Sequence, residues 1–229
     1  MINLKLGMVI AAGGSGSRSS RKVNKLLVEY NDKPLLIHTL EMFYPVISPG
    51  SMVVAAPADL LDEMQKITES YLPDNNIRWT VGGSTRISSV YRAAMLLDDS
   101  IELIAVHDAA RPLASVELLK ELCEAARLFG GAVPGMTPVD TIKQIDSNGF
   151  IANNLIRKEL AAVATPQVFK YVHYIQALKS LPESILSGQL EDPLLTDDAA
   201  VFMRQKNQVK VVYSSLPNHK ITVQSDLKK

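Results

Sequence analysis

The sequence predicts an α/β protein built on a doubly wound, mostly parallel β-sheet. Short apolar runs, typical of buried strands, alternate with amphipathic helical patterns along most of the chain. Three of these runs end in loops of small and polar residues, after positions 12, 81 and 106. Because ligands of such sheets lie beyond the carboxyl ends of the strands, we expect all three loops to lie at that edge.

Length and composition are consistent with a single domain over residues 1–229. The chain has 229 residues, is 47% hydrophobic and carries 24 basic and 24 acidic side chains. This balance argues against nucleic acid or a membrane surface as a partner held by bulk charge. The first residues run straight into a strand and no apolar run is long enough to span a bilayer, so we expect a cytoplasmic protein.

The first strand ends at Ala12 and leads into Gly13-Gly14-Ser15-Gly16-Ser17-Arg18. Glycines let the backbone approach a ligand, and backbone N–H groups in such a loop can turn toward an anion. Arg18 and Lys25 add positive charge, so the simplest ligand is a polyphosphate. The Walker pattern is excluded because no Gly-Lys pair exists, and the dinucleotide fingerprint fails at Ser19. For this loop alone, an ordinary strand-to-helix turn remains an alternative.

The next elements follow from periodicity and from proline and glycine signals. Pro34 opens a helix that runs to Phe43, since proline suits the first helical turn, and Pro45 stops it. A strand at 52–56, an amphipathic helix at 60–71 and a strand at 77–81 follow.

A second glycine loop, Gly82-Gly83-Ser84-Thr85-Arg86, repeats the arrangement of strand, glycines, hydroxyls, cation and helix. The strand at 101–106 then ends in His107-Asp108-Ala109-Ala110-Arg111-Pro112, followed by a helix at 115–128 and a strand at 132–134. Cys123 lies on the apolar face of that helix and is expected to be a buried, inert thiol. One cysteine and four scattered histidines leave no zinc site.

A β-hairpin interrupts the alternation at about residues 138–158. Apolar runs at 141–145 and 150–152 flank Asp146-Ser147-Asn148-Gly149, and Asn-Gly between such runs is a strong hairpin signal. A two-stranded ribbon is marginal in water by itself. We therefore expect this arm to pack on a partner, with a second subunit as the preferred candidate.

The last third is expected to return to the α/β pattern. It contains a helix at 168–180, a loop or short helix at 182–195, and a helix through about 206 that Thr196-Asp197-Asp198 caps. Strands at 209–213 and 220–223 follow, and Ser225-Asp226 begins a final helix.

Together these motifs resemble the 2-C-methyl-D-erythritol 4-phosphate cytidylyltransferase family, in the family's order and over nearly the whole chain. The motifs that carry the resemblance are 11–18 with Lys25, Gly82-Gly83 with Arg86 and Ser89, 106–112, 140–143, Arg157, 165–169, 196–199 and 220–222. The resemblance implies a Rossmann-like nucleotidyltransferase fold and a homodimer joined by the 138–158 arm. It also implies a reaction of CTP with methylerythritol phosphate that gives 4-diphosphocytidyl-methylerythritol and pyrophosphate, with Mg²⁺ bound with CTP, in non-mevalonate isoprenoid synthesis.

The resemblance also assigns roles to residues. Arg18 and Lys25 match the family's transition-state stabilisers, and Asp108 resembles the carboxylate that holds Mg²⁺ at the nucleotide. The residues expected to contact the nucleotide are Ala11, Ala12, Gly13, Gly83, Ser84, Ser89 and Asp108. The residues expected to contact the acceptor are Thr141, Arg157, Thr165 and Lys220, of which Arg157 and Lys220 also count among the catalytic residues.

The chemistry agrees with these assignments. The attacking acceptor phosphate is anionic near neutral pH, so no general base is required, and none is evident. Catalysis is then positioning and electrostatic stabilisation of the charge that develops on the phosphoryl oxygens. Arg86 either holds the second glycine loop, reaches the nucleotide or forms a structural salt bridge. His107 is expected to be structural, and Arg157, at the end of the arm, is expected to enter the neighbouring subunit's site.

Three other functions remain to be separated by experiment. The acceptor could be another polyol phosphate, such as ribitol 5-phosphate. A sugar-1-phosphate nucleotidyltransferase is disfavoured, because its longer glycine-rich signature and larger size are missing. A catalytically silent nucleotide-binding protein is disfavoured because the charged residues are present. Asn24, Leu26 and Met203 depart from the family pattern.

Overall fold

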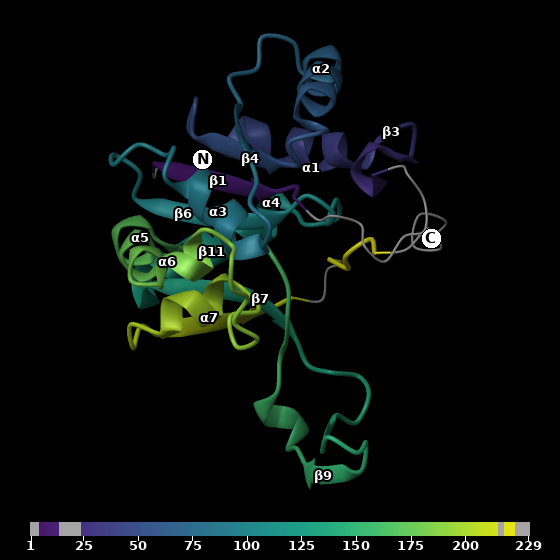
Figure 1. Ribbon diagram of the computed structural model, residues 1–229, viewed down its shortest axis with the longest axis vertical. Helices are drawn as coiled ribbons and strands as arrows, with labels where there is room; N and C mark the ends of the chain where they lie inside the picture. The colour runs from purple at the N-terminus through teal and green to yellow at the C-terminus, as the bar shows by residue number, and fades with distance from the viewer. Residues whose placement is uncertain (1–4, 14–23, 215–217, 223–229) are drawn as a thin grey trace.

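The computed structural model describes residues 5–13, 24–214 and 218–222, and its centre is an eight-stranded sheet (Figure 1). The order of the strands is β10-β7-β11-β6-β1-β4-β5, with β12 beside β7. Their bounds are β1 Leu6–Ala11, β4 Met52–Ala56, β5 Arg78–Val81, β6 Leu103–Asp108, β7 Gly131–Met136, β10 Ala162–Val163, β11 Gln167–Lys170 and β12 Val209–Tyr213. The doubly wound, mostly parallel sheet is confirmed.

The strands that carry the predicted loops are neighbours at the centre of the sheet. β1 pairs in parallel with β4 on one side and with β6 on the other, and β4 pairs in parallel with β5. Ala11, the last residue of β1, is in register with Asp108 of β6 and Ala55 of β4. The ends of the first and fourth predicted strands are therefore side by side.

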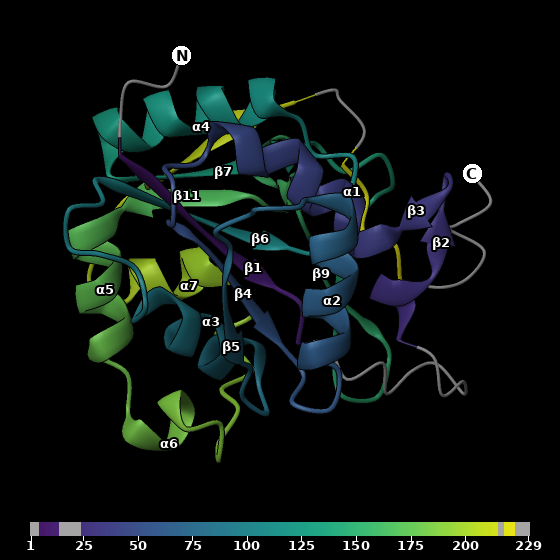
Figure 2. The ribbon, with the colours of Figure 1, turned by 90° about the horizontal axis from the view of Figure 1, so that it is seen from above.

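Helices cover both faces of the sheet (Figure 2). One face packs against α1 (Leu35–Phe43), α2 (Leu61–Tyr71) and α4 (Val116–Phe129), and the other against α3 (Arg86–Ala94), α5 (Tyr171–Lys179), α6 (Glu183–Leu186) and α7 (Asp198–Met203). Successive strand residues alternate between these cores: Met8 and Ile10 belong to one, and Val9 to the other. Both faces of the strands are apolar for this reason.

The predicted helix at 168–180 is wrong over its first three residues. Gln167–Lys170 form β11, an antiparallel strand inserted between β6 and β7, and α5 starts at Tyr171. The buried side chains of Val168 and Phe169 enter opposite cores, which a strand allows and one helix face does not.

Smaller differences concern short elements. Of the strand predicted at 220–223, the described residues 220–222 form no strand, and the N–H of Ile221 donates instead to the carbonyl of Ala110. The helix predicted through 206 ends at Met203, and the one at Ser225-Asp226 lies outside the described residues. The remaining short elements are η1 (Lys25–Leu27), β2 (Glu29–Tyr30), β3 (Lys33–Pro34), η2 (Tyr44–Val46) and η3 (Arg157–Glu159).

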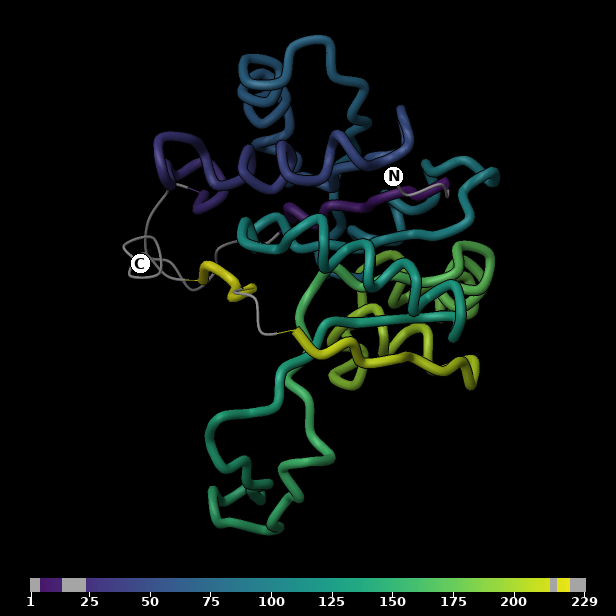
Figure 3. Tube along the Cα trace, turned by 180° about the vertical axis from the view of Figure 1, so that it is seen from behind, coloured from purple at the N-terminus to yellow at the C-terminus, as the bar shows by residue number. Residues whose placement is uncertain are grey.

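The predicted hairpin is present and projects from the body of the molecule (Figure 3). β8 (Lys143–Ile145) and β9 (Ile151–Asn154) pair antiparallel around the Asp146–Gly149 turn. Its apolar side chains are exposed, with Val139 at 88% and Phe150 at 71% of full accessibility. In the described part of the chain, no helix has the length and apolarity to cross a membrane.

Candidate active site

The two glycine loops come together at Ser89, which lies close to Gly13 of the first and to Gly82 of the second. A Cβ atom at Gly13 would lie 3.1 Å from Oγ of Ser89, and one at Gly82 would lie 3.0 Å from the same atom. Glycine at both positions lets the end of β1 and the end of β5 approach the start of α3 closely. The expected convergence of these loops at one edge is therefore confirmed.

Hydrogen bonds hold the second glycine loop in place. The N–H of Gly83 donates to Ser89 Oγ at 3.0 Å, and the Ser89 hydroxyl donates to the carbonyl of Thr85 at 2.8 Å. Thr85 and Ser88 form a capping box that starts α3. The Ser84 hydroxyl donates to the carbonyl of Gly188 at 2.6 Å, so the loop after α6 supports this one.

The structure thus gathers the predicted nucleotide contacts at one edge of the sheet. Three of them, Ala11, Ala12 and Gly13, end β1, while Gly83, Ser84 and Ser89 lie across from them at the start of α3. Ala12 and Ser89 are buried, and Gly13 and Gly83 are partly exposed. Backbone groups of small residues and the exposed Ser84 therefore lie at this edge of the sheet.

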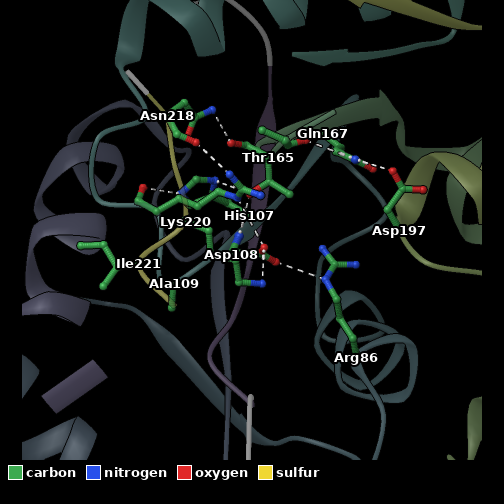
Figure 4. A network of polar contacts seen from close by, with 12 residues as sticks. Arg86, His107, Asp108, Ala109, Thr165, Gln167, Asp197, Asn218, Lys220 and Ile221 are labelled. Atoms are coloured by element: carbon green, nitrogen blue, oxygen red, sulfur yellow. Dashed lines mark hydrogen bonds and ion pairs between the residues drawn. The ribbon is translucent and has the colours of Figure 1, made fainter. Parts of the chain in front are cut away.

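Asp108, at the end of β6, is surrounded by three cations (Figure 4). Its Oδ1 lies 3.2 Å from Arg86 Nε, and its Oδ2 lies 2.9 Å from Lys220 Nζ and 3.5 Å from Arg111 Nε. Burial alone would raise the pKa of Asp108, but Arg86 and Lys220 outweigh it and hold that pKa well below its usual range. Asp108 is therefore ionised at any physiological pH.

Arg111 is a site residue to which the sequence analysis gave no role. Its Nη1 donates to the carbonyl of Asn218 at 2.8 Å, and this contact draws the 218–222 segment against the loop after β6. The motif His107–Pro112 contained the signal, because it places a second charge three residues after Asp108.

His107 is buried and positions its neighbours. Its Nε2 lies 3.1 Å from the carbonyl of Arg111, so Nε2 carries the proton, and Nδ1 accepts from the Thr165 hydroxyl at 3.1 Å. The N–H of Asp108 donates to that hydroxyl oxygen at 3.0 Å. Burial lowers the pKa of His107 to about 4. The ring is thus neutral and structural, as expected, and Thr165 anchors the backbone of Asp108.

Lys25 and Lys220 approach the site together. Lys25 Nζ donates to the carbonyl of Ile221 at 3.0 Å, next to Lys220 in the chain. Asn24 caps η1, the short helix that begins with Lys25, and Leu26 in the same helix is buried. These two residues depart from the family pattern, and both hold the backbone of Lys25 in place. Arg18, the other predicted stabiliser, lies outside the described residues.

Thr141 and Arg157 form a separate pair on the arm. Arg157 Nη2 donates to Thr141 Oγ1 at 3.1 Å, and both side chains are exposed. Among the described contacts, none joins either residue to Asp108 or Lys220. Within one chain, the predicted acceptor residues therefore fall into two groups: Thr165 and Lys220 at the sheet, and Thr141 and Arg157 on the arm.

The residues around Asp108 do not fit a Mg²⁺ ion held by the protein. Mg²⁺ needs several oxygen ligands, and here one carboxylate faces three cations that repel a further positive charge. The described part of the chain has no cluster of three or more His, Cys, Asp or Glu side chains able to hold a metal. The predicted role of Asp108 as a metal ligand is disfavoured on these grounds.

A hollow also lies beside the start of β6. It measures about 440 Å³ and is lined by residues that include Ile101, Leu103, Lys170 and His173. Leu103 and Asp108 stand at opposite ends of β6, so this hollow is separate from the site.

Comparisons with known proteins agree on one family. A family model described as 2-C-methyl-D-erythritol 4-phosphate cytidylyltransferase matches residues 6–229. Proteins of that name from Caldanaerobacter subterraneus subsp. tengcongensis and Clostridium tetani are 31% and 33% identical to the chain. The matches cover 98% and 96% of this chain and 96% and 86% of theirs, respectively.

Solved structures lead to the same family. The 4-diphosphocytidyl-2C-methyl-D-erythritol synthase from Anaerococcus prevotii superimposes with a TM-score of 0.80 at 28% identity, covering 97% of this chain and 94% of that one. The cytidylyltransferase from Thermus thermophilus gives 0.73 at 25% identity, covering 98% and 96%.

Proposed function

The chain belongs to the 2-C-methyl-D-erythritol 4-phosphate cytidylyltransferase family, and we propose that the edge of the sheet around Asp108 is where its two substrates meet. It transfers CMP from CTP to 2-C-methyl-D-erythritol 4-phosphate, giving 4-diphosphocytidyl-2-C-methyl-D-erythritol and pyrophosphate. This is a step of non-mevalonate isoprenoid synthesis. We place the reaction in the cytoplasm.

The reaction requires no proton to be removed. An oxygen of the acceptor phosphate attacks the α-phosphorus of CTP and forms a P–O bond, while the bond from that phosphorus to the bridging oxygen breaks. The electron pair leaves with pyrophosphate. Negative charge on the phosphoryl oxygens is the quantity that the site must stabilise, and fixed cations supply this stabilisation without reorganisation.

Lys25 and Lys220 are the described cations to which we assign this role. The observation that carries the proposal is that Lys220 contacts Asp108, while Lys25 donates to the carbonyl of Ile221, the next residue in the chain. Lys25, with Arg18, would stabilise the triphosphate, and Lys220 would hold the acceptor phosphate. Asp108 keeps Lys220 and Arg111 in place until the phosphates arrive, because each cation has the same carboxylate as partner.

The nucleotide would lie across the two glycine loops. The residues from Ala11 to Gly13 are small, and Ser89 holds the backbone of Gly83, so both segments would form a narrow, ordered wall for the base. Mg²⁺ would arrive on the triphosphate of CTP, where phosphate oxygens replace missing protein ligands and screen the charge. The protein then contributes cations rather than carboxylates.

A homodimer would complete the acceptor site. The arm exposes Ile145, Phe150 and Ile151, and a surface of this kind is typical of a protein interface. Thr141 and Arg157 sit on this arm, away from Lys220. A second copy that receives the arm would therefore gain a guanidinium and a hydroxyl for the acceptor phosphate.

The decisive assay measures pyrophosphate release with CTP, UTP, ATP and GTP, each with methylerythritol phosphate and with ribitol 5-phosphate. We expect release with CTP and methylerythritol phosphate to exceed every other combination by at least about tenfold. Faster release with ribitol 5-phosphate would reassign the acceptor. Nucleotide binding without release on either acceptor would support a silent nucleotide-binding protein.

A further inference from the structure

One guanidinium joins two carboxylates that come from different layers of the fold. Arg86, at the start of α3, places Nε 3.2 Å from Asp108 Oδ1 and Nη1 2.7 Å from Asp198 Oδ2. Asp108 ends β6, and Asp198 begins α7. The closer contact is to Asp198, so the position of Arg86 depends on α7 as well as on the site.

Asp198 is itself fixed by a buried phenol. The hydroxyl of Tyr174 donates to Asp198 Oδ1 at 2.5 Å, and both residues are at most 1% exposed. Burial raises the pKa of Tyr174 well above its ordinary value, and the charge of Asp198 adds to this effect, so the phenol remains a donor. The Tyr174 ring stacks on Phe169 at 4.9 Å between centroids, which sets the direction of its hydroxyl.

The start of α7 is also tied to the sheet. Gln167 of β11 donates from Nε2 to Asp197 Oδ2 at 2.9 Å (Figure 4). It also accepts at Oε1 from the N–H of Ala199 at 2.9 Å. Gln167 is in register with Val106 of β6, two residues before Asp108. The carboxylate of Asp198 thus has a defined place relative to the strand that carries Asp108.

We propose that Tyr174 and Asp198 are positioning residues for the transfer reaction, acting on Asp108 through Arg86. With Asp198 in place, Arg86 offers only Nε to Asp108, and Oδ2 of Asp108 remains with Lys220 and Arg111. Arg86 Nη2 has no hydrogen-bond partner among the described residues. A guanidinium released from Asp198 is therefore free to turn both of its arms to Asp108 and to displace Lys220, since bidentate pairing with a carboxylate is favourable.

The predicted consequence lies on the acceptor side of the reaction. This inference rests on the proposed role of Lys220 in holding the acceptor phosphate. Misplacing Lys220 should raise KM for the acceptor and lower kcat, whereas Gly83 and Ser84 of the second glycine loop are held by Ser89 and Gly188 rather than by Asp198. A purely structural role would instead lower stability without separating the two substrates.

Two phenylalanine variants on the same helix test this. Tyr174→Phe keeps the ring and its stacking on Phe169 but removes the hydrogen bond to Asp198. Tyr171→Phe is the matched control, because Tyr171 is also buried on α5 and its hydroxyl donates to the carbonyl of Leu97 at 3.2 Å. For Tyr174→Phe we expect kcat/KM for the acceptor to fall about tenfold, with KM for CTP within twofold of wild type, whereas Tyr171→Phe should keep both values.

A double-mutant cycle with Lys220→Arg tests whether the effect of Tyr174→Phe on the acceptor reaches Lys220. The effects of Tyr174→Phe and Lys220→Arg on acceptor kcat/KM should be less than additive, because both disturb the same contact. Equal effects of Tyr174→Phe and Tyr171→Phe, or strict additivity, would overturn the inference. Wild-type turnover with CTP and methylerythritol phosphate is measured first, and its absence would sink the proposed function instead. Should Tyr174→Phe fail to fold, Asp198→Asn, which keeps the shape of the side chain, provides the same comparison.

Discussion

Lys220 Nζ lies 2.9 Å from Asp108 Oδ2, across 112 residues of chain. This contact brings the end of the described chain to the central strand β6. Because Arg86 and Arg111 contact the same carboxylate, Asp108 gathers charges from three separate segments. In an empty site these three cations share one carboxylate, and in a loaded site we expect them to face phosphates.

The dependence on Mg²⁺ should not involve Asp108. In Asp108→Asn, we expect acceptor kcat/KM to fall about a hundredfold, because Lys220 and Arg111 lose the charge that places them. The Mg²⁺ concentration that gives half-maximal rate should stay within twofold of wild type, since the metal would be carried by CTP. A Mg²⁺ titration of pyrophosphate release measures this, and a tenfold rise in the half-saturating concentration would identify Asp108 as a ligand.

A site shared between subunits predicts complementation. Lys25→Ala and Arg157→Ala homodimers should each lose most activity, because each lacks one cation at every site. Heterodimers formed by mixing them contain one site with both cations, so activity should return to a substantial fraction of one wild-type site. Two differently tagged variants, isolated as heterodimers, allow the comparison. Heterodimers that stay inactive would place both residues of a site on one chain.

Stability should decline in mild acid because of His107. Its pKa is about 4 in the folded protein against an ordinary value of 6.5, so the unfolded chain binds the proton first as the pH falls. The free energy of unfolding is therefore unaffected by the titration of His107 above about pH 6.5. It falls progressively as the pH drops to about 4, by up to about 3 kcal/mol.

Urea unfolding at several pH values measures how the free energy of unfolding changes with pH. His107→Gln, which cannot titrate, should flatten this dependence between pH 6.5 and 4, whereas the loss from Asp108 falls at lower pH. The NMR titration of the His107 ring gives an independent reading, and a midpoint near 6.5 would contradict the assignment.

The loop after α6 should affect nucleotide binding through Gly188. A Cβ atom at this position would lie 2.3 Å from Ser84 Oγ, on a backbone with φ of +81°. Gly188→Ala should therefore displace the Gly82–Thr85 loop and raise KM for CTP about tenfold. The control is Gly50→Ala, where φ is +69° but no atom lies within 4 Å. Both variants share the cost of a side chain at positive φ, and only Gly188→Ala adds the clash with Ser84. An equal KM for CTP in both would refute the link.

Local patterns were sufficient to predict most of the fold and part of the site. Glycines after a buried strand, and Asp108 and Arg111 after another, are consequences of chain direction, and parallel strands bring such ends together. The Asn148-Gly149 turn predicted the hairpin for a similar local reason. The convergence of Lys25 and Lys220 followed only from the family resemblance, because no periodicity relates residues so far apart.

What could not be predicted depends on tertiary pairing. The four residues of β11 run directly into α5, so their apolar pattern merges with the helical one, and only the gap between β6 and β7 makes them a strand. The Arg86–Asp198 contact likewise joins two helix N-termini that are distant in sequence. The sequence did not indicate a role for Tyr174, because tyrosines on the buried face of a helix are common in protein cores.

The place of β11 has a consequence for synthesis on the ribosome. β6 and β7 do not pair with each other and are joined only by β11, which follows both of them and the arm in the chain. A nascent chain that has emerged only to the arm therefore presents the open edge of β6 to solvent. The gap between β6 and β7 closes only when residues 167–170 have been synthesised. The same stretch of chain brings Thr165, which binds the N–H of Asp108, and Gln167, which binds the start of α7. Until that point the emerging polypeptide is expected to need protection from aggregation, and the centre for phosphoryl transfer assembles among the last parts of the molecule.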